Sequence, residues 1–144
     1  MIIIKNKIYD YHKDHSYGKL NILLNDLIDD FEKVQIEFST LKKCYDNEHF
    51  KSINGVYLDF IICNKDNCNS CPHGLYWYQY IKSGSRKGFS SLYIGKNLTK
   101  KKANKIKCAT NLKTVADYNN KNKMLHRKKN EITKKLFKIQ KILQ

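Results

Sequence analysis

Residues 56–81 of the chain read VYLDFIICNKDNCNSCPHGLYWYQYI. Residues 56–62 and 75–81 are apolar and aromatic runs typical of strands, and a polar, cysteine-rich loop separates them. A third run, residues 89–94, follows a glycine-bearing turn at residues 83–88 and should form a hairpin with residues 75–81. We therefore expect a three-stranded antiparallel sheet with a zinc-knuckle-like loop, a size near the minimum for independent stability.

A long helix is expected before this sheet. Its apolar residues alternate spacings of four and three, which is an a/d heptad stripe, and neither Gly nor Pro occurs between Lys19 and Gly55. The stripe consists of Leu20, Leu24, Leu27, Phe31, Val34, Phe38, Leu41 and Tyr45. Aspartates and glutamates occupy its polar positions. Such a helix must bury its stripe, either on its own domain or in a coiled coil.

The chain after the sheet is expected to be helical and basic. Thr99 should cap a helix by accepting a hydrogen bond from the amide of Lys101 or Lys102. A second heptad-like stripe follows between Leu125 and Leu143, and residues 119–122, NNKN, are a weak point that could separate two helices. The opposite charges of the two stripes favour their pairing, within one chain or across a homodimer.

These elements predict one α+β domain. It has four parts: an N-terminal segment at residues 1–17, an acidic helix at 18–51, the sheet with its Cys/His loop at 52–98, and a basic helical arm at 99–144.

The charge of the chain is concentrated in its last third. The 144 residues carry a net charge of +15, but residues 1–95 hold 12 basic and 11 acidic side chains, whereas residues 96–144 hold 16 basic side chains and only Asp117 and Glu131. An A+T-rich genome would enrich lysine but would not remove the carboxylates. We therefore expect a polyanion, DNA or RNA, as partner, and deletion after Leu98 to abolish its binding. The predicted phosphate contacts are Arg86, Lys87, Lys100, Lys101, Lys102, Lys105, Lys107, Lys113, Lys121, Lys123, Arg127, Lys128 and Lys129.

The loop between the first two strands carries a candidate metal site. Cys63, Cys68, Cys71 and His73 fall within 11 residues, and three thiolates with one imidazole are a ligand set of structural zinc sites. The alternative is incidental thiols in a loop. Nucleophilic catalysis by a cysteine with His73 as base lacks a third orienting group, so no catalytic residue is predicted. Cys44 and Cys108 are expected to be small apolar residues rather than ligands.

Three tyrosines share one face of the predicted sheet. Tyr76, Tyr78 and Tyr80 alternate with the other residues of their strand, and Tyr57 and either Tyr93 or Phe89 could join them from the neighbouring strands. Such a face can stack the bases of single-stranded nucleic acid. The same face can instead be covered by a helix, and we favour that second interpretation because long helices flank the sheet.

The cysteines, the residues HGLYWY at 73–78 and the residues YIGKNL at 93–98 together resemble a family of small uncharacterised proteins of bacteria, archaea and mobile elements. The resemblance covers the sheet and both flanking helices. Two departures are Leu75, where the family pattern has proline, and a short spacing between Cys71 and His73. The resemblance implies this architecture and an association with mobile elements and their nucleic acids, but no reaction.

The sequence thus predicts a non-enzymatic, zinc-stabilised nucleic-acid-binding protein from a virus, phage or other mobile element. The alternative is a protein that binds and regulates a nucleic-acid enzyme or a ribonucleoprotein such as a CRISPR-type effector. No segment approaches the roughly 20 consecutive apolar residues of a membrane span. We expect no membrane contact and a location in the cytoplasm, or in the host-cell cytoplasm if the protein is virus-encoded.

Overall fold

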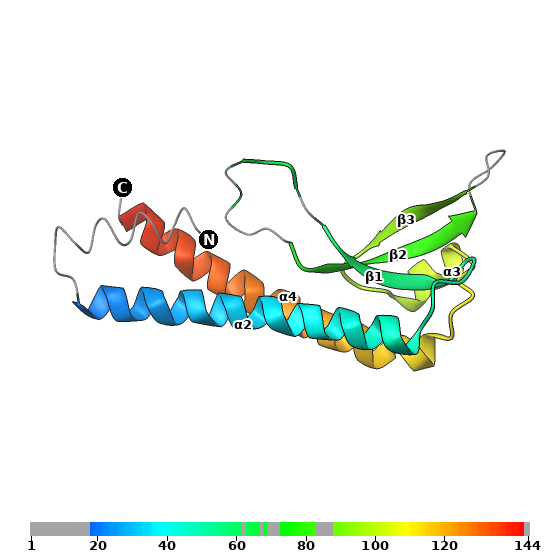
Figure 1. Ribbon diagram of the computed structural model, residues 1–144, viewed down its shortest axis with the longest axis horizontal. Helices are drawn as coiled ribbons and strands as arrows, with labels where there is room; N and C mark the ends of the chain where they lie inside the picture. The colour runs from blue at the N-terminus through cyan, green and yellow to red at the C-terminus, as the bar shows by residue number, and fades with distance from the viewer. Residues whose placement is uncertain (1–17, 62, 67, 69–72, 83–87, 143–144) are drawn as a thin grey trace.

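The computed structural model describes residues 18–61, 63–66, 68, 73–82 and 88–142. Its elements, in chain order, are α2 (Gly18–Glu48), β1 (Val56–Phe60), β2 (Leu75–Lys82), β3 (Phe89–Gly95), α3 (Lys100–Lys105) and α4 (Leu112–Ile142). The three strands form an antiparallel sheet in the order β1-β2-β3 (Figure 1). The predicted α+β class and sheet are therefore confirmed, whereas the segment at residues 1–17 lies outside the described part.

The long helices α2 and α4 run antiparallel and pack against each other along their heptad stripes (Figure 1). At the end distant from the sheet, Leu24, Leu27 and Ile28 of α2 are buried against Leu136 and Ile139 of α4. The two predicted stripes thus pair within one chain. A homodimer stays a prediction, and it would have to use a surface other than this seam.

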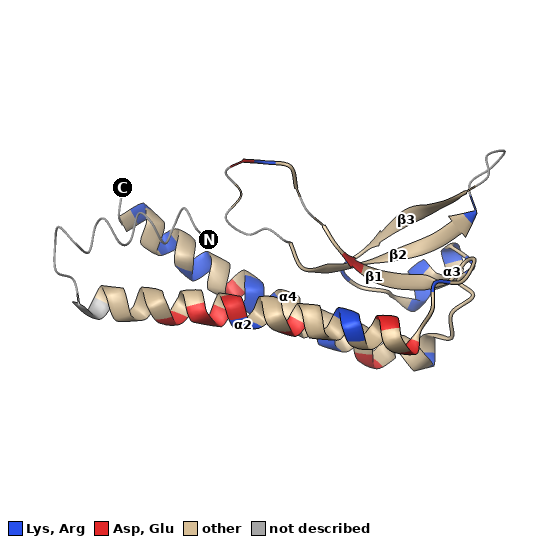
Figure 2. Cartoon of the chain, in the orientation of Figure 1, with Lys and Arg blue, Asp and Glu red and all other residues tan. Residues whose placement is uncertain are grey.

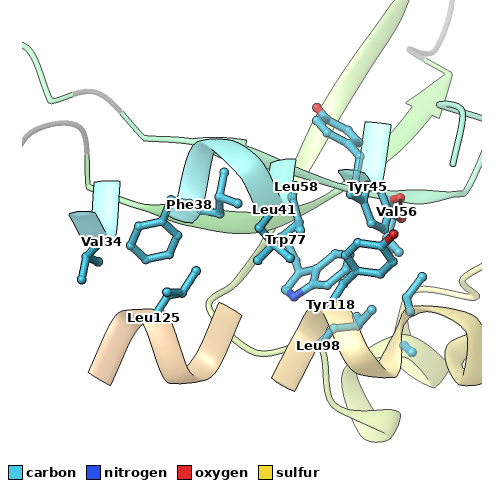
Figure 3. Close-up of a cluster of buried hydrophobic side chains, with 14 residues drawn as sticks. Val34, Phe38, Leu41, Tyr45, Val56, Leu58, Trp77, Leu98, Tyr118 and Leu125 are labelled. Atoms are coloured by element: carbon cyan, nitrogen blue, oxygen red, sulfur yellow. Dashed lines mark hydrogen bonds between the residues drawn. The ribbon is translucent and has the colours of Figure 1, made fainter. Parts of the chain in front are cut away.

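The sheet packs against the paired helices through one face only. The side chains along β2 alternate between buried and half-buried, with Leu75, Trp77 and Gln79 turned toward the helices. Trp77 is fully buried, and its ring lies edge-on to that of Tyr45 from α2, which in turn contacts Tyr118 from α4 (Figure 3). The main core therefore lies between this face and the two helices.

The prediction that a helix covers the tyrosine face is wrong. Tyr76, Tyr78 and Tyr80 are half-buried on the face opposite the helices, because the row of Leu75 and Trp77 supplies the apolar contacts. Tyrosine rings tolerate this position, since the hydroxyl can stay hydrated while the ring packs on its neighbours. The sheet thus has one helix-covered face and one aromatic face.

The suggested break at residues 119–122 is also wrong, because α4 is continuous through it. Asn119 and Asn122 face the sheet, where their side chains bond the backbone of distant residues. The interruption comes earlier, between α3 and α4. The helix cap was predicted correctly: the Thr99 hydroxyl accepts a hydrogen bond from the amide of Lys102 at 3.2 Å.

The basic C-terminal third is not a separate arm. Five of its residues belong to the main core: Leu98, Ala103, Val115, Tyr118 and Leu125. Deletion after Leu98 would remove four of the fourteen buried residues of that core and all of α4, so the deletion test suggested by the charge distribution would unfold the protein rather than isolate the charge. Within the described residues, no helix has both the length and the apolar character needed to span a bilayer.

Candidate metal centre and nucleic-acid interface

Three of the four predicted metal ligands come together beside the sheet. His73 Nε2 lies 3.1 Å from Cys63 Sγ and 3.4 Å from Cys68 Sγ, and the three ligand atoms all fall within 4.8 Å of one another. The side chains are half-buried. This group could hold a metal ion. Cys71, the fourth predicted ligand, lies outside the described residues.

The backbone on either side of the loop fixes these ligands. Cys63 follows β1 closely, and the amide of His73 donates to the carbonyl of Ile61 at 2.9 Å. This hydrogen bond holds the two ends of the loop together two residues before β2 begins. The amide of Cys68 donates to the carbonyl of Lys65 at 3.3 Å, which closes a turn inside the loop. The ligands thus meet because an antiparallel pair of strands brings the ends of their connection together.

Gly74 connects the ligands Cys63, Cys68 and His73, which we call the metal group, to the first buried residue of β2. Its φ of +84° is in the left-handed region, which favours glycine. A Cβ at this position would lie 2.9 Å from Cζ of Phe38 in α2 and 3.0 Å from Cε1 of His126 in α4. The loop therefore enters β2 through a gap between the two helices that admits no side chain.

The Gly74→Ala substitution is expected to destabilise the protein by about 2–4 kcal/mol, because the left-handed conformation costs an alanine about 1–2 kcal/mol and the buried ring of Phe38 has little room to move. Urea unfolding followed by the fluorescence of Trp77, the one tryptophan of the chain, measures the change. A loss below about 1 kcal/mol would show that the loop relaxes there without strain.

The two remaining cysteines lie apart from the metal group. Cys108 is half-buried against the main core, as expected for a small apolar residue. Cys44 is exposed on α2, so the expectation of an apolar role fails for it. Neither joins the ligand group formed by the described residues.

The uncovered face of the sheet is a continuous aromatic surface. Tyr78 of β2 lies opposite Tyr57 of β1 and Tyr93 of β3 in the strand registers, and its ring centroid is 5.7 Å from each of theirs. Tyr80 stacks on Phe89 at 4.7 Å with an interplanar angle of 19°. Burial raises the pKa of Tyr78 above its usual value, so the phenol is neutral at physiological pH. The sheet therefore presents ring faces and neutral hydroxyls together.

One end of this aromatic surface contacts His126 of α4. The ring of Tyr76 lies 5.9 Å from that of Tyr93 and 5.1 Å from that of His126 in α4. His126 in turn lines a pocket of about 150 Å³ with Lys96, Asn97, Lys123, Arg127 and Asn130. We call Lys96, Lys123 and Arg127 the basic cluster.

His126 lies between Tyr76 and the basic cluster. Its Nε2 donates to the carbonyl of Leu75 at 2.5 Å. Burial lowers its pKa below the usual value, and the positive charges of Lys96 and Lys129 act in the same direction. The imidazole is therefore neutral at pH 7 and supports the start of β2, while the cationic groups stand around it.

The predicted phosphate contacts differ in their exposure and in their partners within the chain. In Figure 2, the positions of basic residues predominate along α3 and α4, and most positions of acidic residues lie along α2. Exposed or half-buried positions are held by Lys100, Lys101, Lys102, Lys105, Lys107, Lys113, Lys121, Lys123, Arg127 and Lys128. Two of them have partners in the chain: Lys102 donates to the carbonyls of Ile94 and Asn97 at 3.4 Å, and Lys128 pairs with Glu37 at 3.8 Å.

The structure corrects the prediction that Lys129 contacts phosphate. Its side chain is only 4% exposed, and its ammonium lies 5.6 Å from the ring centroid of Phe31 in α2, so it is not on the surface that meets a ligand. Its position on the inner side of α4 explains why: the residue lies three to four positions from His126 and Leu125, which both face inward. Arg86 and Lys87 lie outside the described residues.

The interface contains residues that the sequence did not assign to a site. Lys96 directly follows β3, and only the approach of α4 shows that it stands beside Lys123 and Arg127. Tyr93 and Phe89 were alternatives for joining the tyrosine face, and both join it. Their four-residue spacing in β3 is even, and this places both side chains on the same face of a strand.

Comparison with known proteins places the chain in a family. A family profile described as a domain of unknown function, DUF6788, matches residues 31–105, which span the second half of α2, the sheet, the metal group and α3. No curated protein and no solved structure matches the chain. The match covers more than half of the 144 residues and agrees with the resemblance expected from the cysteines and the His-Gly aromatic strand. The chain therefore belongs to the DUF6788 family, whose members share a domain without an established activity.

Proposed function

We propose that this protein is a non-enzymatic nucleic-acid-binding protein with a structural zinc site. The observation that carries the proposal is the basic cluster of Lys96, Lys123 and Arg127, which shares a pocket with His126, a residue that contacts Tyr76 of the uncovered aromatic sheet face. Phosphates require cationic side chains that can reach solvent, and bases require ring faces or polar groups. The two kinds of group meet at Tyr76 and His126.

Zinc is the metal that suits the ligand group best. A sulfur and a nitrogen bound tetrahedrally at about 2.3 Å and 2.0 Å stand about 3.5 Å apart, close to the 3.1 Å and 3.4 Å between His73 and the two cysteines. Cys63, Cys68 and His73 would hold the ion, and Cys71 would complete a closed set. Zinc in such a site would cross-link the side chains that bind it, and four protein ligands would leave no position for an activated water. This favours a structural role, in which the ion ties the loop to the start of β2.

The basic surface favours a polyanion over a small anion. Exposed lysines continue from the basic cluster onto α3 and along α4, and residues 96–144 contain only two carboxylates. Lysine ammonium groups act as point charges and fix the position of a backbone without reading its sequence. We therefore expect binding with a strong electrostatic component and little sequence preference.

Binding is expected to weaken steeply with salt. Each neutralised phosphate contributes about −0.7 to −0.9 to the slope of log affinity against log salt. The triple substitution K96Q/K123Q/R127Q should lower the magnitude of this slope by about 2, because three contacts are lost. Fluorescence anisotropy with a labelled oligonucleotide, titrated at several KCl concentrations, measures both slopes.

The matched control is K134Q/K138Q/K141Q, which removes the same charge from exposed positions near the C-terminal end of α4. It should leave the slope close to that of the unmodified chain. Equal losses in both variants would mean that only net charge matters. A flat salt dependence in the unmodified chain would overturn the proposal and favour the alternative of a regulator that binds a protein partner.

A further inference from the structure

We infer that the nucleic acid is single-stranded and that its bases stack on the aromatic face of the sheet while its phosphates contact the basic cluster. The inference rests on the proposed function and specifies its ligand. It is carried by His126, which contacts Tyr76 of that face and lines the same pocket as the basic cluster, and by the exposure of the rings on β3.

The accessible part of the aromatic face lies on β2 and β3. Tyr93 is 54% exposed and Phe89 is 51% exposed, whereas Tyr57 at the β1 edge is buried. Tyr57 lies beneath the ammonium of Lys51, which is 4.4 Å from its ring centroid, and its hydroxyl is hydrogen-bonded to Ser91. A ligand would therefore meet Tyr76, Tyr78, Tyr80 and the two rings of β3, with Tyr57 as support.

Exposed rings of this kind need a planar partner. Soluble proteins rarely leave contiguous apolar surface uncovered unless it binds something. A base is flat, and base–aromatic stacking works with every base because each has a π-face. In a duplex the base faces are stacked on one another and out of reach, so only unpaired bases can use a flat sheet surface.

The charges beside the rings favour a nucleic acid over an apolar protein partner. Tyr76 contacts Tyr93 and His126, and His126 lines the pocket with Lys96, Lys123 and Arg127. Lys82 lies on the aromatic face as well, opposite Phe89 in the register and exposed. Bases and phosphates alternate along a single strand, and here His126 links the rings to the cationic groups, while the carboxylate of Asp59, which lies opposite Tyr76, is paired with Lys42 at 3.7 Å. A second copy of this chain would instead bring two sets of positive charges together.

The test compares binding of labelled oligo(dT) and oligo(U) with binding of a dA·dT duplex of equal length, at one salt concentration. The variants are Tyr93→Ser and Tyr93→Phe. Tyr93→Ser should weaken single-strand binding about 5- to 100-fold, as expected for the loss of one stacked base, and Tyr93→Phe should keep most of the affinity. Duplex binding should be weaker than single-strand binding in the unmodified chain and should change little in either variant.

Leu92→Ser is the matched control, because Leu92 is its neighbour in β3, is 42% exposed and lies on the opposite face of the sheet. It should bind like the unmodified chain. Equal single-strand affinity in Tyr93→Ser and the unmodified chain would overturn the inference while leaving salt-dependent binding, and with it the proposed function, intact. Absence of binding to all three probes would overturn both. A change of mass in solution on Tyr93→Ser would show that the face is a protein interface, which also overturns the inference.

Discussion

Protein purified without chelator is expected to contain about one zinc ion per chain, and its removal is expected to lower the free energy of unfolding by about 2–4 kcal/mol. This range corresponds to a free metal concentration about 30 to 1,000 times the dissociation constant. For a chain of this length it lowers the thermal midpoint by about 5–15 °C. Elemental analysis and thermal unfolding with and without EDTA provide the two measurements.

Global unfolding on metal removal is not expected. The main core is built by α2, α4 and one sheet face, and its members include Phe38, Trp77 and Leu125 but none of the three described ligands, Cys63, Cys68 and His73. The ion would instead hold the loop against the start of β2, next to Gly74. Zinc-finger peptides, which have hardly any other core, depend on the metal entirely; this chain should lose only part of its stability.

Cys63→Ser and Cys44→Ser form a matched pair for this prediction. Cys63→Ser should lose the metal and the associated stability, whereas Cys44→Ser alters an exposed thiol on α2 and should change neither. Cys71→Ser tests the predicted fourth ligand. A metal content below about half an ion per chain, or identical melting with and without EDTA, would contradict the zinc assignment.

Local periodicity made the helices and strands predictable. The heptad stripe of α2 needs no distant information, because spacings of three and four place its apolar residues on one side of a helix. The metal group was predictable for the same reason: its ligands are close in sequence, and two adjacent strands bring them together in space. Both features depend on residues that are close together in the sequence.

The choice of sheet face was not predictable in this way. A period of two shows that β2 has two faces, and both of them are rich in large side chains. Gln79 is a polar residue on the same face as Leu75 and Trp77, yet it is only 2% exposed. Its side-chain amide donates to the carbonyls of Asn54 and Ile106, both at 3.1 Å. Its burial depends on these two acceptors, 25 and 27 residues away, which no local pattern reveals.

Asn122→Ala is expected to destabilise the protein by about 2–4 kcal/mol. The side chain is fully buried, and its Nδ2 donates to the carbonyls of Leu75 and Lys96, each at 3.1 Å. These carbonyls lie just beyond the last register pair between β2 and β3, Trp77 with Gly95. The carbonyl of Leu75 also accepts a hydrogen bond from His126, so the main loss falls on the carbonyl of Lys96. Leaving a buried carbonyl without its donor costs about 1–3 kcal/mol, and the cavity left by the shortened side chain adds to this loss. Denaturant unfolding monitored by Trp77 fluorescence measures the loss.

The control substitution, Asn120→Ala, separates this role from helix propensity. Asn120 is exposed on the same turn of α4, and alanine is the better helix former by about 0.5 kcal/mol. If residues 119–122 were only a weak point in the helix, both substitutions would stabilise the protein. Because Asn122 replaces the missing end of the sheet ladder, the two changes should have opposite signs: a small gain for Asn120→Ala and a large loss for Asn122→Ala. Two gains would mean that α4 does not hold the sheet through this amide.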